Sequence, residues 1–171
     1  TQSLVVGTLL LEIEANLNGD PGTVLEVQGT AHWLSGSIYP AIQVASGGTL
    51  TISGYNYHDL QGALTNAGTV NLSTALSANA NIANTGTFHF LNESGSIYGP
   101  GGQTFANTGT VVVNTTYTST IGIPCVNDGT LSIEAGALSF YTDLVNNASI
   151  AIGADATLTL SPDSTWFNTG S

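Results

Sequence analysis

The fold is decided by the stretch Phe105-Ala106-Asn107-Thr108-Gly109-Thr110-Val111-Val112-Val113, which returns along the chain with small changes. Its pattern is an apolar residue, any residue, Asn, any residue, Gly-Thr, and then apolar, any, apolar. Further copies begin at Val44, Leu64, Ile82, Cys125 and Leu144, and their glycine positions, the last occupied by Ala148, follow at intervals of 20, 18, 23, 20 and 19 residues. A period of this length is typical of solenoids, in which each repeat forms one turn of a stack.

Each copy combines a corner with a strand. Asn tolerates left-handed backbone and Gly adopts positive φ, so we expect the chain to turn at Asn-x-Gly. After the corner apolar residues alternate with period two, as Leu50 and Ile52 do, which indicates a strand with one buried face. Helical spacing is absent, and hairpins explain an identical corner in every repeat less well than coils that wind the same way. The intervening segments, such as 96–98 and 136–140, are expected to supply a third side.

The sequence therefore predicts an all-β protein, a right-handed, three-sided parallel β-helix (β-solenoid) of about eight coils. We expect one domain over residues 1–171, with residues 1–21 as an N-terminal cap or inter-subunit segment. Stacked coils bring equivalent side chains on top of one another. An asparagine ladder is expected, with Ser46 at the equivalent position of the first copy, and its members are Asn66, Asn84, Asn107, Asn127 and Asn146. The parallel threonine ladder contains Thr49, Thr69, Thr87, Thr110 and Thr130.

The composition limits the partners. The chain has no Lys or Arg and carries a formal charge of −11, so salt bridges to basic side chains cannot stabilise it. Binding of nucleic acid and of anionic lipid depends on basic groups that neutralise phosphates, and we exclude both. No apolar stretch reaches the length of a spanning helix, so membrane insertion is not expected.

These repeats resemble those of bacterial surface adhesins of the filamentous-haemagglutinin and autotransporter-passenger kind, in which phrases like Asn107–Val113 and Asn127–Ile133 recur in long arrays. The likeness covers residues 22–171. It implies a secreted, rod-like, right-handed β-helix at the extracellular cell surface, with a role in adhesion or surface architecture. The predicted function is therefore that of a noncatalytic structural or adhesive module, whose partners are surface glycans, surface proteins or further copies of itself.

The two ends suggest self-assembly. Residues 166–171 stop in the middle of the repeat, and no capping repeat follows them. Solenoids normally cover their open strand edges with caps. The apolar segment Leu4–Ile13 could pair with such an edge on a neighbouring copy, which predicts head-to-tail filaments, while a segment cut from a longer rod is the alternative.

Catalysis is the second hypothesis, because parallel β-helices also include polysaccharide lyases and hydrolases. The candidate acids and bases are Glu12 and Glu14, with Glu26 near them, and Asp59 beside His58. They do not form a clear pair of the kind that acid–base catalysis needs. We therefore expect no enzyme activity.

Other polar residues are expected to have structural places. We expect His32, His58 and His89 at the surface, and Asp20 and Asp128 in turns. No cofactor is predicted, although the many oxygen ligands leave Ca²⁺ binding open.

Three further features of the sequence bear on function. Cys125 shares a column with Leu64 and Phe105, which predicts a buried small apolar residue. Tyr55, Tyr57, Tyr98, Tyr117 and Tyr141 fall in or beside the loops, where they either stack on a ligand or fill the edge of the core. The threonine row suggests ice binding as a further alternative, which the mixed neighbouring column of Thr51, Asn71, His89, Val112, Ser132 and Ala151 weakens.

Overall fold

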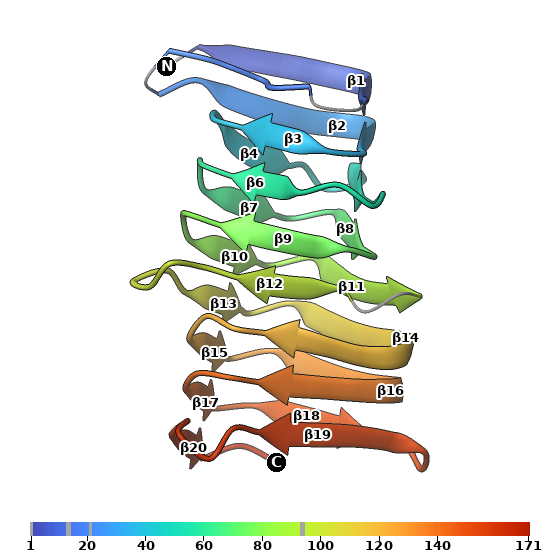
Figure 1. Cartoon of the computed structure of the whole chain (residues 1–171), viewed down its shortest axis with the longest axis vertical. Coiled ribbons are helices and arrows are strands. Elements are labelled where there is room, and N and C mark those ends of the chain that lie inside the picture. The colour runs from blue at the N-terminus through green and yellow to red at the C-terminus, as the bar shows by residue number, and fades with distance from the viewer. Residues whose placement is uncertain (1, 13–14, 21, 93–94) are drawn as a thin grey trace.

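The chain folds into a stack of parallel β-strands, with the N-terminus and the C-terminus at opposite ends of the stack (Figure 1). The computed structural model describes residues 2–12, 15–20, 22–92 and 95–171. Within these ranges there are 20 strands, all in one hydrogen-bonded sheet, and no helix. The predicted all-β parallel solenoid of about eight coils is confirmed. Its right-handedness and its three sides stay predictions.

Three ladders of paired strands run along the stack. The first contains the first parts of β1 (Ser3–Leu11) and β2 (Val24–Trp33), followed by β4 (Ala41–Val44), β7 (Leu64–Asn66), β10 (Ile82–Asn84), β13 (Phe105–Asn107), β15 (Cys125–Asn127), β17 (Leu144–Asn146) and β20 (Trp166–Asn168). The second contains the last parts of β1 and β2, then β5 (Thr49–Ile52), β8 (Thr69–Leu72), β11 (Thr87–Asn92), the first parts of β14 (Thr110–Ile121) and β16 (Thr130–Phe140), and β18 (Ser149–Ile152).

The third ladder contains β3 (Gly36–Ile38), β6 (His58–Leu60), β9 (Ala75–Ala78), β12 (Ser96–Tyr98), the last parts of β14 and β16, and β19 (Ala156–Leu160). The expected third-side segments 96–98 and 136–140 lie in it. Within the predicted N-terminal segment 1–21, strand β1 belongs to the stack, because it pairs with β2 in parallel between Ser3 and Leu11. Whether β1 also caps the rod or contacts a second subunit stays a prediction.

The core is a continuous cluster of buried apolar side chains contributed by all three ladders. The strands alternate buried and less buried residues, as the period of two predicts, and the inward pairs Leu50 and Ile52 and Phe88 and Phe90 are fully buried. Phe88 packs against both Phe90 and Phe105, with ring centroids 5.3 Å apart in each contact. A close-packed aromatic cluster of this kind fixes the middle of the stack.

The reason for the corner glycines differs from the prediction. Positive φ is found at Gly22, Gly36, Gly47, Gly54, Gly101, Gly102 and Gly136, and not at the corner positions Gly68, Gly86, Gly109 and Gly129. These four are required by close approach. A Cβ on Gly86, Gly109 or Gly129 would lie 2.2 Å from the carbonyl oxygen of the corner glycine in the preceding turn. That oxygen accepts a hydrogen bond from the next turn, at 2.9 Å from Thr110 N to Gly86 O, so the two backbones touch.

The corner before β5 is also built differently from the prediction. Val44, and not Ser46, lies beside Asn66 in the first ladder, and Thr49 lies beside Thr69 in the second. Five sequence positions therefore separate the paired residues Val44 and Thr49, whereas three separate Asn66 and Thr69. The longer corner turns at Gly47, whose φ of 87° is in the left-handed region. Ser46 is exposed there and does not join the asparagine ladder.

Candidate functional site

The asparagine ladder is continuous and buried. Asn66, Asn84, Asn107, Asn127 and Asn146 are 0–1% exposed. Each side-chain Nδ2 donates to the Oδ1 of the asparagine in the next turn, at 2.7, 2.7, 2.7, 2.6 and 2.7 Å, and the last acceptor is Asn168. The structure thus brings the five predicted asparagines together in one row, and their amides also donate to corner carbonyls such as Thr130 O.

The threonine ladder is longer than predicted. The pairing places Thr49, Thr69, Thr87, Thr110 and Thr130 in one row, and Ser149 continues it. Thr30 pairs with Thr49, and Thr8 pairs with Thr30, so the row begins in β1. The sequence signal was the dipeptide Gly-Thr at 7–8 and 29–30, which was missed because no Asn precedes it. The neighbouring column keeps the expected mixed composition, from Thr51 to Ala151.

The candidate acid–base residues do not come together. Asp59 accepts hydrogen bonds from Gln61 Nε2 at 2.6 Å and from Asn79 Nδ2 at 2.5 Å, and Asn79 belongs to the following turn. Glu26 accepts from Gln28 at 2.7 Å. Glu12 is exposed after β1, and Glu14 lies outside the described residues. Among the residues that the structure describes, no three His, Cys, Asp or Glu side chains are grouped closely enough to hold a metal ion.

His58 was expected at the surface, and this prediction is wrong. Its side chain is 1% exposed and lies in the core, edge-on to Trp33 with ring centroids 5.3 Å apart. The ring Nε2 reaches the carbonyl oxygens of Ser53 at 2.9 Å and Trp33 at 3.2 Å, and Nδ1 is buried without a hydrogen-bond partner. Burial lowers the pKa of His58 below its ordinary value of 6.5. No sequence pattern indicated this burial, because His58 occupies the place of an apolar residue in the third ladder, beside Leu76.

The other predicted polar positions agree better with the structure. His32 is exposed and His89 is half-buried on the second ladder. Asp128 lies in a corner and accepts a hydrogen bond from Asn147 in the next turn, at 2.8 Å. Cys125 is buried, as predicted, and burial raises the pKa of its thiol to about 12. Asp20 lies exposed between β1 and β2.

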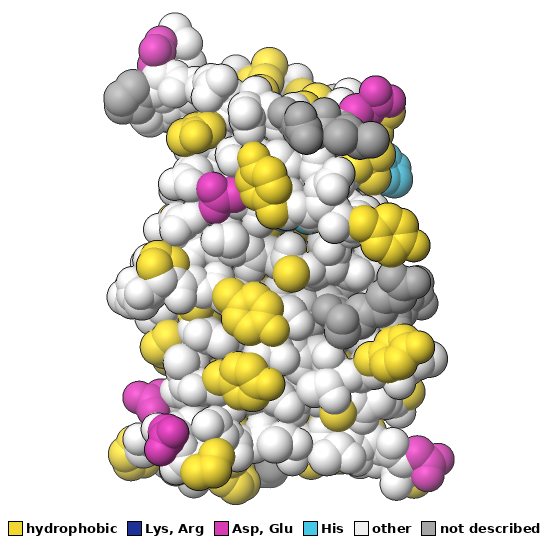
Figure 2. All heavy atoms as spheres, viewed as in Figure 1, with side chains coloured by type: hydrophobic (Ala, Val, Ile, Leu, Met, Phe, Trp, Pro, Cys, Tyr) yellow, Lys and Arg dark blue, Asp and Glu magenta, His cyan; other side chains and the backbone are white. Residues whose placement is uncertain are grey.

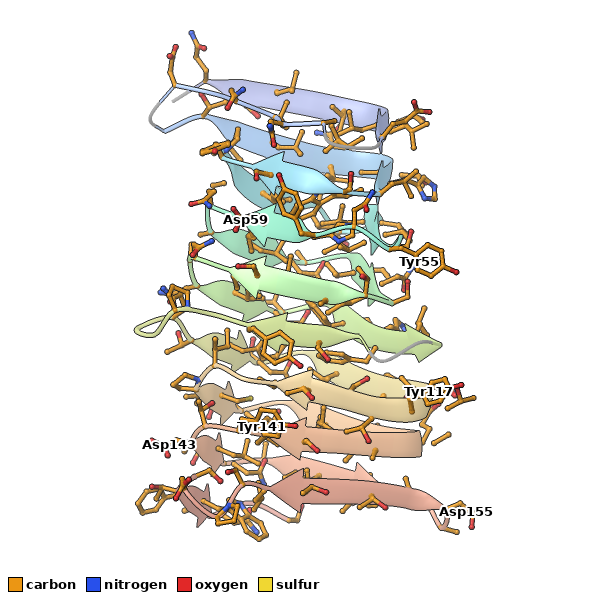
Figure 3. The ribbon with its side chains drawn as sticks, viewed as in Figure 1. Tyr55, Asp59, Tyr117, Tyr141, Asp143 and Asp155 are labelled. Carbon is orange, nitrogen blue, oxygen red and sulfur yellow. The ribbon has the colours of Figure 1, made fainter. Side chains whose placement is uncertain are left out.

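All tyrosine side chains are exposed to solvent. The six tyrosines of the chain are each 44–95% exposed, whereas four of the five phenylalanines are buried in the core. Tyr39, which the sequence analysis did not single out, belongs to this exposed set. Hydrophobic side chains are spread over the middle of the face in Figure 2, and acidic ones lie mainly toward its margins. Figure 3 places Tyr141 on this face, and Tyr55 and Tyr117 along one margin.

Two of these tyrosines share a groove of about 280 Å³, where the chain passes from the second ladder to the third. Tyr55 is 95% exposed and Tyr98 is 44% exposed. The groove crosses three successive turns, and it is lined by Gly54, Tyr55, Ser73, Thr74, Ala75, Ser96 and Tyr98. None of these lining residues is charged.

No family model, no curated protein and no solved structure matches the chain at a significant level. The described residues also contain no helix with the length and hydropathy needed to cross a membrane.

Proposed function

We propose that the chain is a noncatalytic, extracellular structural and adhesive module, in which a rigid solenoid displays exposed side chains to a partner. The observation that carries the proposal is the division of its aromatic residues. Four of the five phenylalanines are in the core, while all six tyrosines are exposed. A tyrosine combines a large apolar ring with a hydroxyl group, which suits recognition at a surface that stays in contact with water.

The frame supports this role. From Asn66 onward the asparagine, glycine and core columns repeat the same contacts between successive turns, and these contacts hold the backbone of those turns in place. Loops and turns between the ladders are free to vary in sequence without changing that frame, and recognition residues commonly lie on such segments. The resemblance to adhesin repeats implies an extracellular location. On that basis we propose that the chain is secreted to the cell surface.

Two alternatives have weaker support. For a carbohydrate-active enzyme, the best-placed carboxylate is Asp59, but its two oxygens accept hydrogen bonds from amides and so hold neighbouring turns together. For ice binding, a regular face of threonines is needed, and the row next to the threonine ladder contains His89, Val112 and Ala151 instead. A thermal-hysteresis measurement tests that alternative directly.

We also propose that copies of the chain stack end to end. Strand β1 exposes Leu4, Val5 and Leu10, and strand β20 exposes Trp166 and Phe167. Among the described strands, β1 pairs with β2 alone and β20 with β17 alone, so each presents apolar side chains beside an edge that another strand could pair with. Light scattering of the purified 171-residue chain is expected to show oligomers. The ratio of oligomer to monomer should rise with the protein concentration. A stable monomer over a wide concentration range would contradict the stacking.

The adhesive function is tested with beads coated with the full chain. Under flow, these beads are expected to be retained on surfaces that carry polysaccharide or extracellular-matrix protein. Beads coated with an inert protein of similar negative charge serve as the control, because they separate specific adhesion from charge effects. Equal release of both kinds of bead from every surface would contradict adhesion, and release of reducing sugar from the polysaccharides would favour the enzyme.

A further inference from the structure

We infer that the groove between Tyr55 and Tyr98 binds a neutral oligosaccharide. The inference rests on the proposed adhesive function and names the class of ligand. A sugar ring presents C–H groups on its faces and hydroxyl groups around its rim. It is therefore bound by an aromatic ring that covers a face and by polar groups that reach the rim.

The groove supplies both kinds of group. Tyr55 follows Gly54, whose φ of 108° turns the backbone in a way that other residues rarely adopt. The tyrosine is thereby presented on a turn with 95% of its surface free. Tyr98 lies two turns further along the stack, about 10 Å away in the direction of the axis at the usual strand spacing. The half-buried hydroxyl-bearing residues Ser73 and Thr74 line the groove between them.

Tyr98 is held in place by its neighbour in the following turn. Its Cα lies one position beyond the pair Ile97 and Ile121, which sets it beside Gly122. A Cβ on Gly122 would lie 3.0 Å from Tyr98 Cδ1, so the ring lies against that glycine. A ring fixed in this way loses little conformational freedom when a ligand binds, which favours affinity.

The charge of the chain selects against charged glycans. No described cation is available to balance a uronate or a sulfate, since the sequence has no Lys or Arg and the formal charge is −11. Among the residues that the structure describes, no carboxylate lines the groove to attract a cationic sugar. A neutral glycan is not repelled by the negative charge of the chain, and it brings no charge that would be buried without a partner.

The test is native affinity electrophoresis of the full chain in gels that contain a soluble neutral polysaccharide, with β-1,3-glucan, hydroxyethylcellulose and galactomannan as separate probes. We expect retardation by at least one of them and none by polygalacturonate. Tyr55→Ala and Tyr98→Ala are each expected to weaken the apparent affinity about tenfold, as loss of a central aromatic contact does. Tyr55→Ala is the more informative variant, because that side chain makes almost no buried contact and its removal leaves the fold intact.

The matched control is Tyr141→Ala, which removes a tyrosine that is 58% exposed and lies outside the groove. Its affinity is expected to stay within about twofold of the wild type, since most surface positions contribute little to binding. Tyr98→Phe keeps the ring against Gly122 and is expected to retain most of the binding that Tyr98→Ala loses.

Three results would overturn the inference: no retardation by any of the three neutral probes, wild-type retardation of both alanine variants, or stronger retardation by polygalacturonate. The bead assay separates this failure from failure of the adhesive function. If the groove fails these tests and beads coated with the wild-type chain are still retained on matrix protein, the chain is adhesive but does not use the groove to bind a neutral glycan.

Discussion

At the scale of single residues, the asparagine ladder works because one side chain carries both a donor and an acceptor. A row of identical amides is therefore self-complementary, and each Nδ2 can serve the Oδ1 of the next turn. The row begins at Asn66, whose neighbour in the preceding turn is Val44. The Oδ1 of Asn66 instead accepts a hydrogen bond from Gly68 N at 3.0 Å, so the first rung is also satisfied.

Replacement of Asn107 in the middle of the ladder tests this view. Asn107→Ala removes the acceptor for Asn84 and the donor to Asn127 at once, and both remaining amides are buried. We expect the free energy of unfolding in urea to fall by about 1–3 kcal/mol, the usual effect of leaving buried polar groups unsatisfied. The control is Asn168→Ala, which removes one acceptor at an exposed position and should have a smaller effect. Equal effects of the two changes would contradict a cooperative ladder.

His58 is the second residue with an unusual environment. In the neutral form, the ring donates from Nε2 to carbonyl oxygens, and the unpartnered Nδ1 carries no proton. In the charged form, Nδ1 carries a proton that has no acceptor in the core. Burial therefore lowers the pKa in the folded chain, and the unfolded chain binds a proton more readily than the folded one.

The free energy of unfolding should therefore decrease as the pH is lowered. The contribution of His58 to stability is fully present above its ordinary pKa of 6.5 and is lost as the pH falls below that value. We expect urea unfolding between pH 7.5 and 5 to show a loss of up to about 1.4 kcal/mol per pH unit from this residue. His58→Gln should reduce that slope, while His32→Gln, at an exposed position, should leave it unchanged. An identical slope in all three proteins would show that His58 does not titrate differently on unfolding.

At the scale of the turn, the corner glycines set how closely two turns approach. The carbonyl oxygen of one glycine lies where the Cβ of the next would be, and it accepts the amide hydrogen of the threonine that follows. Ala148 stands at this position in the last complete copy. There the corresponding hydrogen bond, from Ser149 N to Gly129 O, is 3.2 Å, compared with 2.9 Å from Thr130 N to Gly109 O.

Gly109→Ala is the corresponding test. The added Cβ would lie 2.2 Å from Gly86 O, and the three nearest atoms are all backbone atoms of the preceding turn, so no flexible side chain can move away. We expect a loss of about 1–3 kcal/mol, as for other overpacked core positions, measured by denaturant unfolding. Gly7→Ala is the control, since a Cβ there would meet nothing within 4 Å, and it should change stability by less than about 0.5 kcal/mol.

The sequence was sufficient to predict the parallel stack, the inward pairs and both ladders, because a repeated phrase must occupy equivalent places in a solenoid. It was not sufficient for the corner before β5, where two additional residues move Ser46 out of the asparagine position. It also could not show that the corner glycines are needed for contact between turns. The spacing of residues along the sequence does not reveal how closely the backbones of two successive turns approach each other. His58 was misplaced because a polar residue can enter a core when backbone carbonyls satisfy its ring.

For the candidate site, the sequence identified Tyr55 and Tyr98 separately but not their shared groove. They are 43 positions apart, and their relation depends on the register of β6, β9 and β12. The loops between the ladders vary in length, and that variation hides which outward residues meet. The asparagines and threonines, in contrast, occupy the constant part of each repeat and could be aligned directly.

At the scale of the whole molecule, the absence of Lys and Arg leaves the carboxylates without basic partners. Several of them accept hydrogen bonds from amides across neighbouring turns, where other proteins use ion pairs. Asp59 accepts from Asn79, Asp128 from Asn147, and Asp143 from the backbone of Thr165 at 2.8 Å. Such charge-assisted hydrogen bonds stabilise locally, while the mutual repulsion of 11 negative charges opposes folding everywhere.

Two substitutions with the same change of charge separate these opposing effects. Asp59→Asn exchanges one acceptor oxygen for an NH₂ group, which then faces one of the two amide donors, Gln61 or Asn79, and leaves that hydrogen bond unmade, so we expect a loss of about 1–3 kcal/mol in the free energy of unfolding. Asp155→Asn changes an exposed carboxylate at a distant margin of the rod (Figure 3). It removes one negative charge from a repulsive set, so its effect should lie within about 0.5 kcal/mol, on the stabilising side at low salt. Equal effects of both changes would mean that the repulsion, and not the hydrogen bonding of Asp59, controls the balance.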